Sequence, residues 1–145
     1  MLPAVETAVR EDTLPLEALA DREVAKALSP AALRLFLRIA DEWDLGVAQR
    51  QVLLGGVSRQ TYYNWRDGRV GALSRDQLER ISLVLGIYKG LKLLFADEGS
   101  ARRWFVDANR DQPFGGVSPL AHMLRGSIDD LYAVRRYLDA WRGMT

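Results

Sequence analysis

Residues 48–65 read AQRQVLLGGVSRQTYYNW and predict two helices joined by a sharp turn. We expect the first helix to reach Leu54, because Gly55 and Gly56 can adopt the positive φ that a tight turn requires. Val57 should then fill the space between the two helices. Ser58 is expected to cap the second helix, since its hydroxyl can accept a hydrogen bond from an early backbone N–H that would otherwise lack a partner. This order of features is typical of a helix-turn-helix.

The second predicted helix has an apolar face and a polar face. The apolar face is expected to be buried and consists of residues at helical spacing, namely Val57, Thr61, Tyr62 and Trp65. The polar face carries arginine, glutamine and asparagine, whose paired donors and acceptors match base edges in the major groove of DNA. The predicted DNA contacts are Ser58, Arg59, Gln60, Tyr63 and Asn64, with Arg66 and Arg69 nearer to the phosphates. The alternative is simple packing, because similar helix pairs occur in all-α proteins that do not bind DNA.

The formal net charge of +1 is unevenly distributed along the chain. Residues 1–45 contain 9 acids and 5 bases, whereas residues 46–92 contain 8 bases and 3 acids and so carry a net charge of +5. The positive excess thus lies over the predicted helix-turn-helix, where neutralisation of DNA phosphates would require it. Ordinary solvated helices carry comparable charge, so this observation supports DNA binding only in combination with the polar face.

Composition excludes several classes of protein. A chain of 145 residues without cysteine predicts one compact domain or two small ones, with neither disulfides nor thiolate metal sites. No apolar run approaches the roughly 20 residues of a membrane span. The acidic N-terminal stretch is unlike the basic start of a signal peptide, so we expect a cytoplasmic protein.

The sequence offers no constellation of catalytic residues. Its one histidine, His122, is expected to be a surface or half-buried structural residue. Asp129 and Asp130 are adjacent, so on a helix their carboxylates point in different directions and cannot converge on a substrate. Because phosphate-binding glycine loops and metal-ligand spacings are also missing from the sequence, we expect neither an enzyme nor a bound cofactor or metal.

Helix signals on both sides of residues 48–65 predict an all-α fold. Residues 1–28 are expected to form an arm and a short amphipathic helix. Ser29-Pro30 predicts a helix start, with serine as N-cap and proline at the first helical position. Ser74 and Gln77 have the spacing of a capping box, and the helix behind them is expected to end or kink at Gly86 before a further apolar helix over 87–95.

The C-terminal part, from Ala96 onward, carries several motifs in order. They are Trp104 on a short predicted helix, Asn109, Phe114-Gly115-Gly116, the helix start Ser118-Pro119-Leu120, Leu124, the helix-ending Gly126, and Gly143 on a last helix. This order resembles the toxin-binding domain at the C-terminus of Xre/MbcA/ParS-type antitoxins, a family that places a helix-turn-helix upstream. The resemblance covers residues 29–145. It implies an all-α chain with an N-terminal helix-turn-helix bundle, 29–95, and a small helical toxin-binding domain, 96–145.

The resemblance also implies a function, that of an antitoxin in a type II toxin–antitoxin system. Such antitoxins block a toxin, most typically a RES-domain enzyme that degrades NAD, and repress their own operon by binding promoter DNA as symmetric oligomers, here expected to be homodimers. The expected toxin-binding residues are Trp104, Asn109, Trp141, Arg142, Gly143, Met144 and Thr145. Tryptophan and arginine are frequent interface anchors, although Trp141 also continues the core stripe of the last helix. The alternative function is a plain helix-turn-helix transcription regulator with a helical dimerisation domain.

Overall fold

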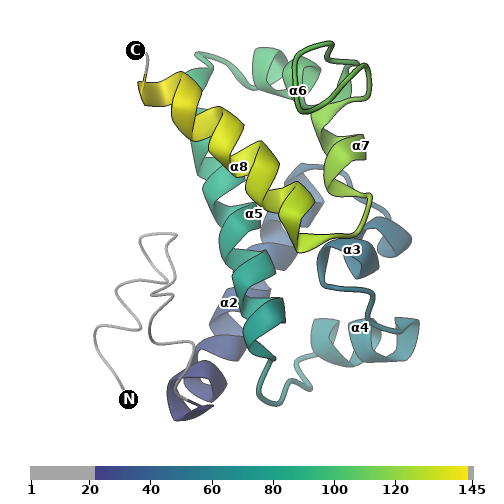
Figure 1. Ribbon diagram of the computed structural model, residues 1–145. Coiled ribbons are helices and arrows are strands. Elements are labelled where there is room, and N and C mark those ends of the chain that lie inside the picture. The colour runs from purple at the N-terminus through teal and green to yellow at the C-terminus, as the bar shows by residue number, and fades with distance from the viewer. Residues whose placement is uncertain (1–21, 144–145) are drawn as a thin grey trace.

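Seven helices and no strand make up residues 22–143, the part of the chain that the computed structural model describes (Figure 1). They are α2 (Arg22–Glu42), α3 (Val47–Leu53), α4 (Arg59–Arg66), α5 (Arg75–Leu94), α6 (Glu98–Val106), α7 (Pro119–Met123) and α8 (Ile128–Gly143). The prediction of an all-α fold is confirmed. Most of the predicted N-terminal arm, residues 1–21, lies outside the described residues, as do Met144 and Thr145.

The long helix α5 lies at the centre of the hydrophobic core. Helices α2 and α8 both pack against it, as Figure 1 shows. Because α5 has neighbours on more than one side, its buried residues extend around much of its circumference instead of forming one stripe. Phe36 from α2, Ile81 and Ile87 from α5, and Leu138 from α8 are all almost completely buried.

Helix α5 continues through Gly86, where the sequence predicted that it would end or kink and be followed by a separate helix. It runs without interruption to Leu94, so the predicted second helix over 87–95 is the last part of α5. Gly86 has a packing role instead. A Cβ atom at this position would lie 1.8 Å from Nη1 of Arg135, so the missing side chain leaves room for the α8 guanidinium to lie against α5.

The helix start predicted at Ser29-Pro30 is wrong, because α2 already begins by Arg22 and passes through both residues. Ser29 is fully buried. Its hydroxyl donates a hydrogen bond to the Ala25 carbonyl at 2.7 Å and accepts one from the Leu73 backbone N–H at 2.9 Å. Ser29 therefore ties α2 to the segment that precedes α5, a long-range role that a local capping pattern does not reveal.

Helices α6 and α8 pack on α5, and α7 packs on both α6 and α8. Ser118 caps α7 by accepting the Ala121 N–H at 2.9 Å, and Pro119 is the first helical residue, both as predicted. The predicted core stripe of α8 is buried at Leu131, Val134 and Leu138. The division of the chain at residues 95 and 96 stays a prediction. None of the helices described over 22–143 is both long enough and apolar enough to span a membrane.

Candidate functional site

Helices α3 and α4 form the predicted helix-turn-helix. Helix α3 ends at Leu53, with Leu54 as its C-cap, and the turn follows with Gly55 at φ 96° and Gly56 at φ 85°. Ser58 caps α4 by accepting the Thr61 backbone N–H at 3.1 Å. The side chains that were expected to face inward do so to different degrees: Tyr62 is buried, whereas Val57, Thr61 and Trp65 are half-buried.

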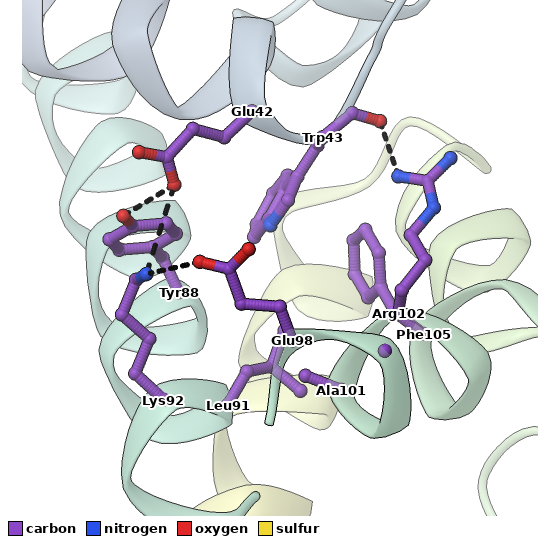
Figure 2. A pocket seen from close by; sticks show the side chains of 10 residues that line it. Glu42, Trp43, Tyr88, Leu91, Lys92, Glu98, Ala101, Arg102 and Phe105 are labelled. Carbon is purple, nitrogen blue, oxygen red and sulfur yellow. Dashed lines mark hydrogen bonds and ion pairs between the residues drawn. The ribbon is translucent and has the colours of Figure 1, made fainter. Parts of the chain in front are cut away.

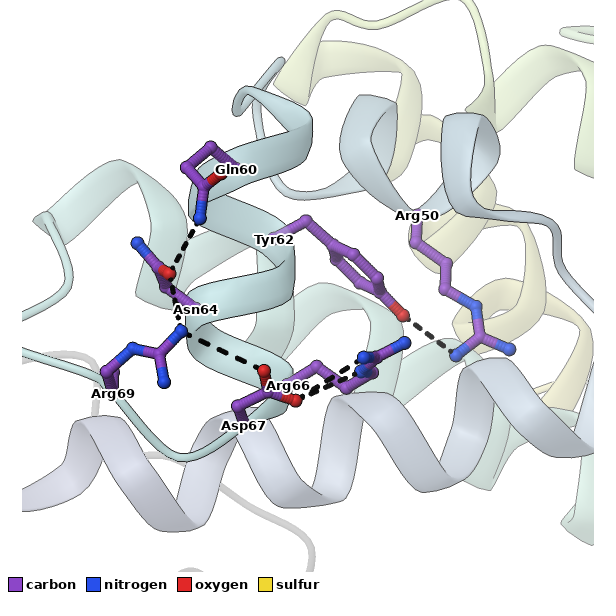
Figure 3. Close-up of polar contacts among 7 residues, drawn as sticks. All are labelled: Arg50, Gln60, Tyr62, Asn64, Arg66, Asp67 and Arg69. Atoms are coloured by element: carbon purple, nitrogen blue, oxygen red, sulfur yellow. Dashed lines mark hydrogen bonds and ion pairs between the residues drawn. The ribbon is translucent and has the colours of Figure 1, made fainter.

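A half-buried arginine that the sequence analysis did not single out, Arg50 of α3, holds this unit together (Figure 3). Its guanidinium donates to the Tyr62 hydroxyl of α4 at 3.1 Å, the contact that Figure 3 draws. It also donates to the Leu45 carbonyl at 2.9 Å and to Asp41 of α2 at 2.8 Å. Burial alone lowers the pKa of Arg50, but the hydrogen bonds to Asp41 and Tyr62 outweigh burial and raise it, so the side chain stays charged. Arg50 therefore fixes α4 relative to both α3 and α2.

Two arginines on the outward face of α4 flank the ring of Tyr63. The guanidinium carbon of Arg59 lies 5.6 Å from the ring centroid and that of Arg66 lies 4.6 Å from it. Arg59 also donates to the Tyr63 hydroxyl at 3.2 Å. Cation–π contacts of this kind restrict the flexible arginine side chains while leaving N–H groups directed toward solvent. The three residues form a positively charged ridge along the helix.

A second set of contacts on α4 joins Gln60, Asn64 and Arg69 (Figure 3). Oδ1 of Asn64 accepts from Nε2 of Gln60 at 3.0 Å and from Nη2 of Arg69 at 2.9 Å. Asp67 lies beside this set, 3.8 Å from Arg69 and 3.4 Å from Arg66. All seven predicted DNA contacts therefore lie on α4 or immediately beside it. Most of them are exposed, and Tyr63 and Asn64 are half-buried.

The predicted toxin-binding residues Trp104 and Trp141 meet in an aromatic cluster formed by Phe95, Trp104, Phe114, Tyr137 and Trp141. Trp104 is its centre, with ring centroids 6.3 Å from Phe95, 5.9 Å from Phe114, 5.9 Å from Tyr137 and 6.2 Å from Trp141. Aromatic pairs at such distances stabilise a fold beyond their buried area. Both tryptophans are half-buried, so each contributes to packing and also presents some surface.

Asn109 braces the loop between α6 and α7. Its backbone N–H donates to the Val117 carbonyl at 3.1 Å, its carbonyl accepts from Gly116 at 2.8 Å, and its side-chain oxygen accepts from the Asp111 N–H at 2.9 Å. Tyr137 of the aromatic cluster donates to Asp111 at 2.8 Å. Burial and this hydrogen bond raise the pKa of the Tyr137 hydroxyl.

The surface around this loop and at the end of α8 is partly apolar. Arg142 and Gly143 are exposed at the end of α8, and Nη1 of Arg142 lies 3.8 Å from Oδ1 of Asp139. Val106 and Val117, which the sequence analysis did not single out, are 37% and 44% exposed. Val106 is the last residue of α6 and Val117 lies in the braced loop, so the apolar periodicity of a helix does not mark either as exposed.

Comparison with known proteins gives two family matches that together span most of the chain. Residues 22–86 match the antitoxin Xre-like helix-turn-helix domain, and residues 91–143 match the antitoxin Xre/MbcA/ParS C-terminal toxin-binding domain. The chain belongs to the Xre family of antitoxins. The antitoxin is also 43% identical over 114 residues to the uncharacterized protein y4oB of Sinorhizobium fredii (strain NBRC 101917 / NGR234), an alignment that covers 79% of this chain and 86% of that protein.

The family confirms that this antitoxin is a binding protein and not an enzyme, since both matched domains serve binding. His122 accordingly has a structural environment, and it is more deeply buried than expected. Its Nε2 lies 3.4 Å from Oδ1 of Asp130, its Nδ1 lies 3.4 Å from Nη1 of Arg125, and its ring packs edge-on against Phe114. These contacts join α7 to the first turn of α8.

A cavity of about 620 Å³ lies in the antitoxin where the two matched regions meet (Figure 2). It opens between α2, α5 and α6 and is lined by Glu42, Trp43, Tyr88, Leu91, Lys92, Glu98, Gly99, Ala101, Arg102 and Phe105. Nζ of Lys92 lies 3.7 Å from Glu98 and 4.0 Å from Glu42, and the Arg102 guanidinium donates to the backbone carbonyl of Trp43 at 2.6 Å. These contacts hold α6 against the end of α2.

These contacts also explain two acidic residues at the end of α2, Asp41 and Glu42. The sequence alone gives no structural reason for them. Asp41 pairs with Arg50, and Glu42 accepts from the Tyr88 hydroxyl and lies close to Lys92. Burial and the Glu42 hydrogen bond raise the pKa of Tyr88, and the contact with Tyr88 raises the pKa of Lys92. The carboxylates are therefore part of the connection between helices.

Proposed function

We propose that this antitoxin belongs to a type II toxin–antitoxin system, blocks a RES-domain toxin that degrades NAD, and represses its own operon as a promoter-bound homodimer in the cytoplasm. The observation that carries the proposal is that one chain holds a helix-turn-helix whose outward face is polar and basic and a toxin-binding domain whose helices α6 and α8 pack on α5. A plain transcription regulator would not require the second of these domains.

DNA binding is supported by the outward face of α4. Arg59 and Arg66 place positive charge along the helix, and Gln60 and Asn64 present amide groups of the kind that bind base edges. A single recognition helix offers too little contact for specific affinity, so we infer a symmetric homodimer that places two such helices on two half-sites.

Toxin binding is supported by the surface formed by the aromatic cluster, the braced loop and the end of α8. Half-buried tryptophans on a rigid base are effective interface anchors, since little side-chain entropy is lost when a partner covers them. Arg142 is exposed at the end of α8, and in this proposal its guanidinium pairs with a carboxylate of the toxin. In this proposal Trp104 and Asn109 form the base of the toxin-binding surface. Trp141, Arg142 and Gly143 contact the toxin at the end of α8.

The test is co-expression with the neighbouring reading frame of the same operon. Expression of that neighbour alone should deplete cellular NAD and stop growth, and co-expression of the full-length antitoxin should restore both and allow the two proteins to be purified as a complex. A neighbour that binds the antitoxin but leaves NAD unchanged would refute the RES assignment. A neighbour that is toxic but forms no complex would refute the antitoxin function.

A further inference from the structure

Arg69 contacts the side chain of Asn64 in a way that determines how that amide points. Nη2 of Arg69 lies 2.9 Å from Oδ1 of Asn64. A guanidinium has five N–H donors and no acceptor, so only the oxygen of an amide can face it at this distance. The N–H groups of the Asn64 amide are consequently directed away from Arg69, and chemistry alone settles the orientation.

The same constraint passes from Asn64 to Gln60. Oδ1 of Asn64 lies 3.0 Å from Nε2 of Gln60. Because the atom on Asn64 is an acceptor, Gln60 must present its nitrogen there, and its Oε1 stays outside the contact. The outward face of α4 therefore offers a hydrogen-bond acceptor at Gln60 and, one helical turn later, donors at Asn64 (Figure 3).

We propose that Arg69 is a specificity-determining residue that sets this acceptor–donor order, rather than a phosphate contact alone. This inference rests on the proposed DNA binding. An unconstrained asparagine binds adenine with both amide atoms, whereas Asn64 has its oxygen engaged twice and contributes donors only. Two such donors fit best the adjacent O6 and N7 acceptors of guanine in the major groove, and the acceptor at Gln60 fits the amino group of adenine or cytosine.

Arg66 is a matched control for Arg69. Both residues carry one positive charge, both are exposed, and both lie close to Asp67. Arg66 packs on the Tyr63 ring and has no contact with either amide in the polar network of α4. Removing Arg66 therefore changes the charge as removing Arg69 does, but it leaves the amide orientation unchanged.

The experiment selects bound sequences from a pool of synthetic DNA duplexes with a randomised segment, using the full-length parent, Arg69→Ala and Arg66→Ala. Thermal melting of each protein confirms that it is folded. The parent is expected to enrich a motif with discrimination of about 5- to 150-fold at the position that Asn64 contacts. Arg66→Ala should enrich the same motif more weakly overall, with a shallower salt dependence. Arg69→Ala should shift the preferred base at that position toward adenine, which an unconstrained asparagine binds with both amide atoms, and should keep the remainder of the motif.

A second variant, Asn64→Asp, tests whether residue 64 contacts its base through N–H donors. It keeps an oxygen that can accept from Gln60 and Arg69, and it replaces the N–H donors with an acceptor, so the preferred base should change to adenine or cytosine. An Arg69→Ala motif identical to that of the parent, or an unchanged motif for Asn64→Asp, would overturn the inference. If the parent itself enriches no motif, the proposed DNA binding fails and this inference fails with it.

Discussion

Replacing Arg50 by methionine is expected to destabilise the antitoxin far more than the same change at an exposed arginine. Methionine retains much of the aliphatic volume of arginine but removes every N–H donor. The side chain of Arg50 is 14% exposed, and its partners include the Tyr62 hydroxyl, from a residue that is 2% exposed, and the carbonyl of buried Leu45. The substitution therefore leaves two buried acceptors without the hydrogen bonds that they have in the parent.

The expected magnitude follows from those two groups. A buried polar group that loses its partner costs roughly 1–3 kcal/mol, so the Tyr62 hydroxyl and the Leu45 carbonyl together should cost about 2–6 kcal/mol. The ion pair with Asp41 adds little, about 0–1 kcal/mol, because the Asp41 side chain is 72% exposed and water replaces its partner. The loss of free energy of unfolding should therefore arise from the buried acceptors and not from the charge pair.

Urea unfolding of four full-length proteins at neutral pH separates these contributions: the parent, Arg50→Met, Tyr62→Phe and the double variant. Because Tyr62→Phe removes the acceptor that Arg50→Met would leave unpaired, the double variant should lose less stability than the two single changes added together. The difference should be about 0.5–3 kcal/mol, as expected for directly contacting residues. Arg34→Met, at an exposed position of α2, is the control and should change the free energy of unfolding by no more than about 0.5 kcal/mol. An Arg50→Met protein as stable as the control, or strictly additive changes in the cycle, would refute this reasoning.

Three further predictions concern binding and pH. The double variant Gln60→Ala/Asn64→Ala should fold normally and bind promoter DNA more weakly by roughly 1–3 kcal/mol per lost base contact, as measured by a gel shift; unchanged binding would contradict the assignment of α4. Arg142→Ala should fold normally but fail to protect cells from the toxin, whereas Arg136→Ala on the same helix should protect; equal protection by both would exclude a role for Arg142. The pKa of Tyr137 is raised above 10.0, so its neutral form stabilises the fold below that pH, and stability should fall as the pH rises through the higher folded-state pKa. Tyr137→Phe should reduce this alkaline loss in thermal melts across the range, and an identical loss would show that another group is responsible.

Local chemistry explains why the helix-turn-helix could be predicted from the sequence. Gly55 and Gly56 adopt positive φ, and the Ser58 hydroxyl accepts a hydrogen bond from the backbone N–H three residues later. The glycine turn and the serine cap therefore depend only on residues close to them in the sequence. The capping box of Ser74 and Gln77 is confirmed for the same reason. The order of motifs in the C-terminal part was sufficient to predict its family, because most of these motifs also mark helix ends or turns.

Local sequence patterns gave wrong helix boundaries where contacts with distant segments determine the structure. Ser29-Pro30 has the pattern of a helix start, but the Leu73 N–H, 44 residues away, binds the Ser29 hydroxyl inside α2. Gly86 has the pattern of a helix end, but Arg135 of α8 occupies the space beside it. The pairing of Arg50 with Asp41 and Tyr62 likewise depends on how three helices meet, which apolar spacing in one helix does not specify.

The uninterrupted course of α5 has a consequence for how the antitoxin loses its structure. The two family matches end and begin within this one helix, at residues 86 and 91, so no flexible linker separates them in the described fold. Helices α2 and α8 both bury apolar surface against α5, so the loss of either helix exposes part of the core that the other helix shares. We therefore expect a single cooperative melting transition rather than two. A destabilising substitution in the core of either half should therefore abolish the proposed promoter binding and the proposed toxin inhibition together.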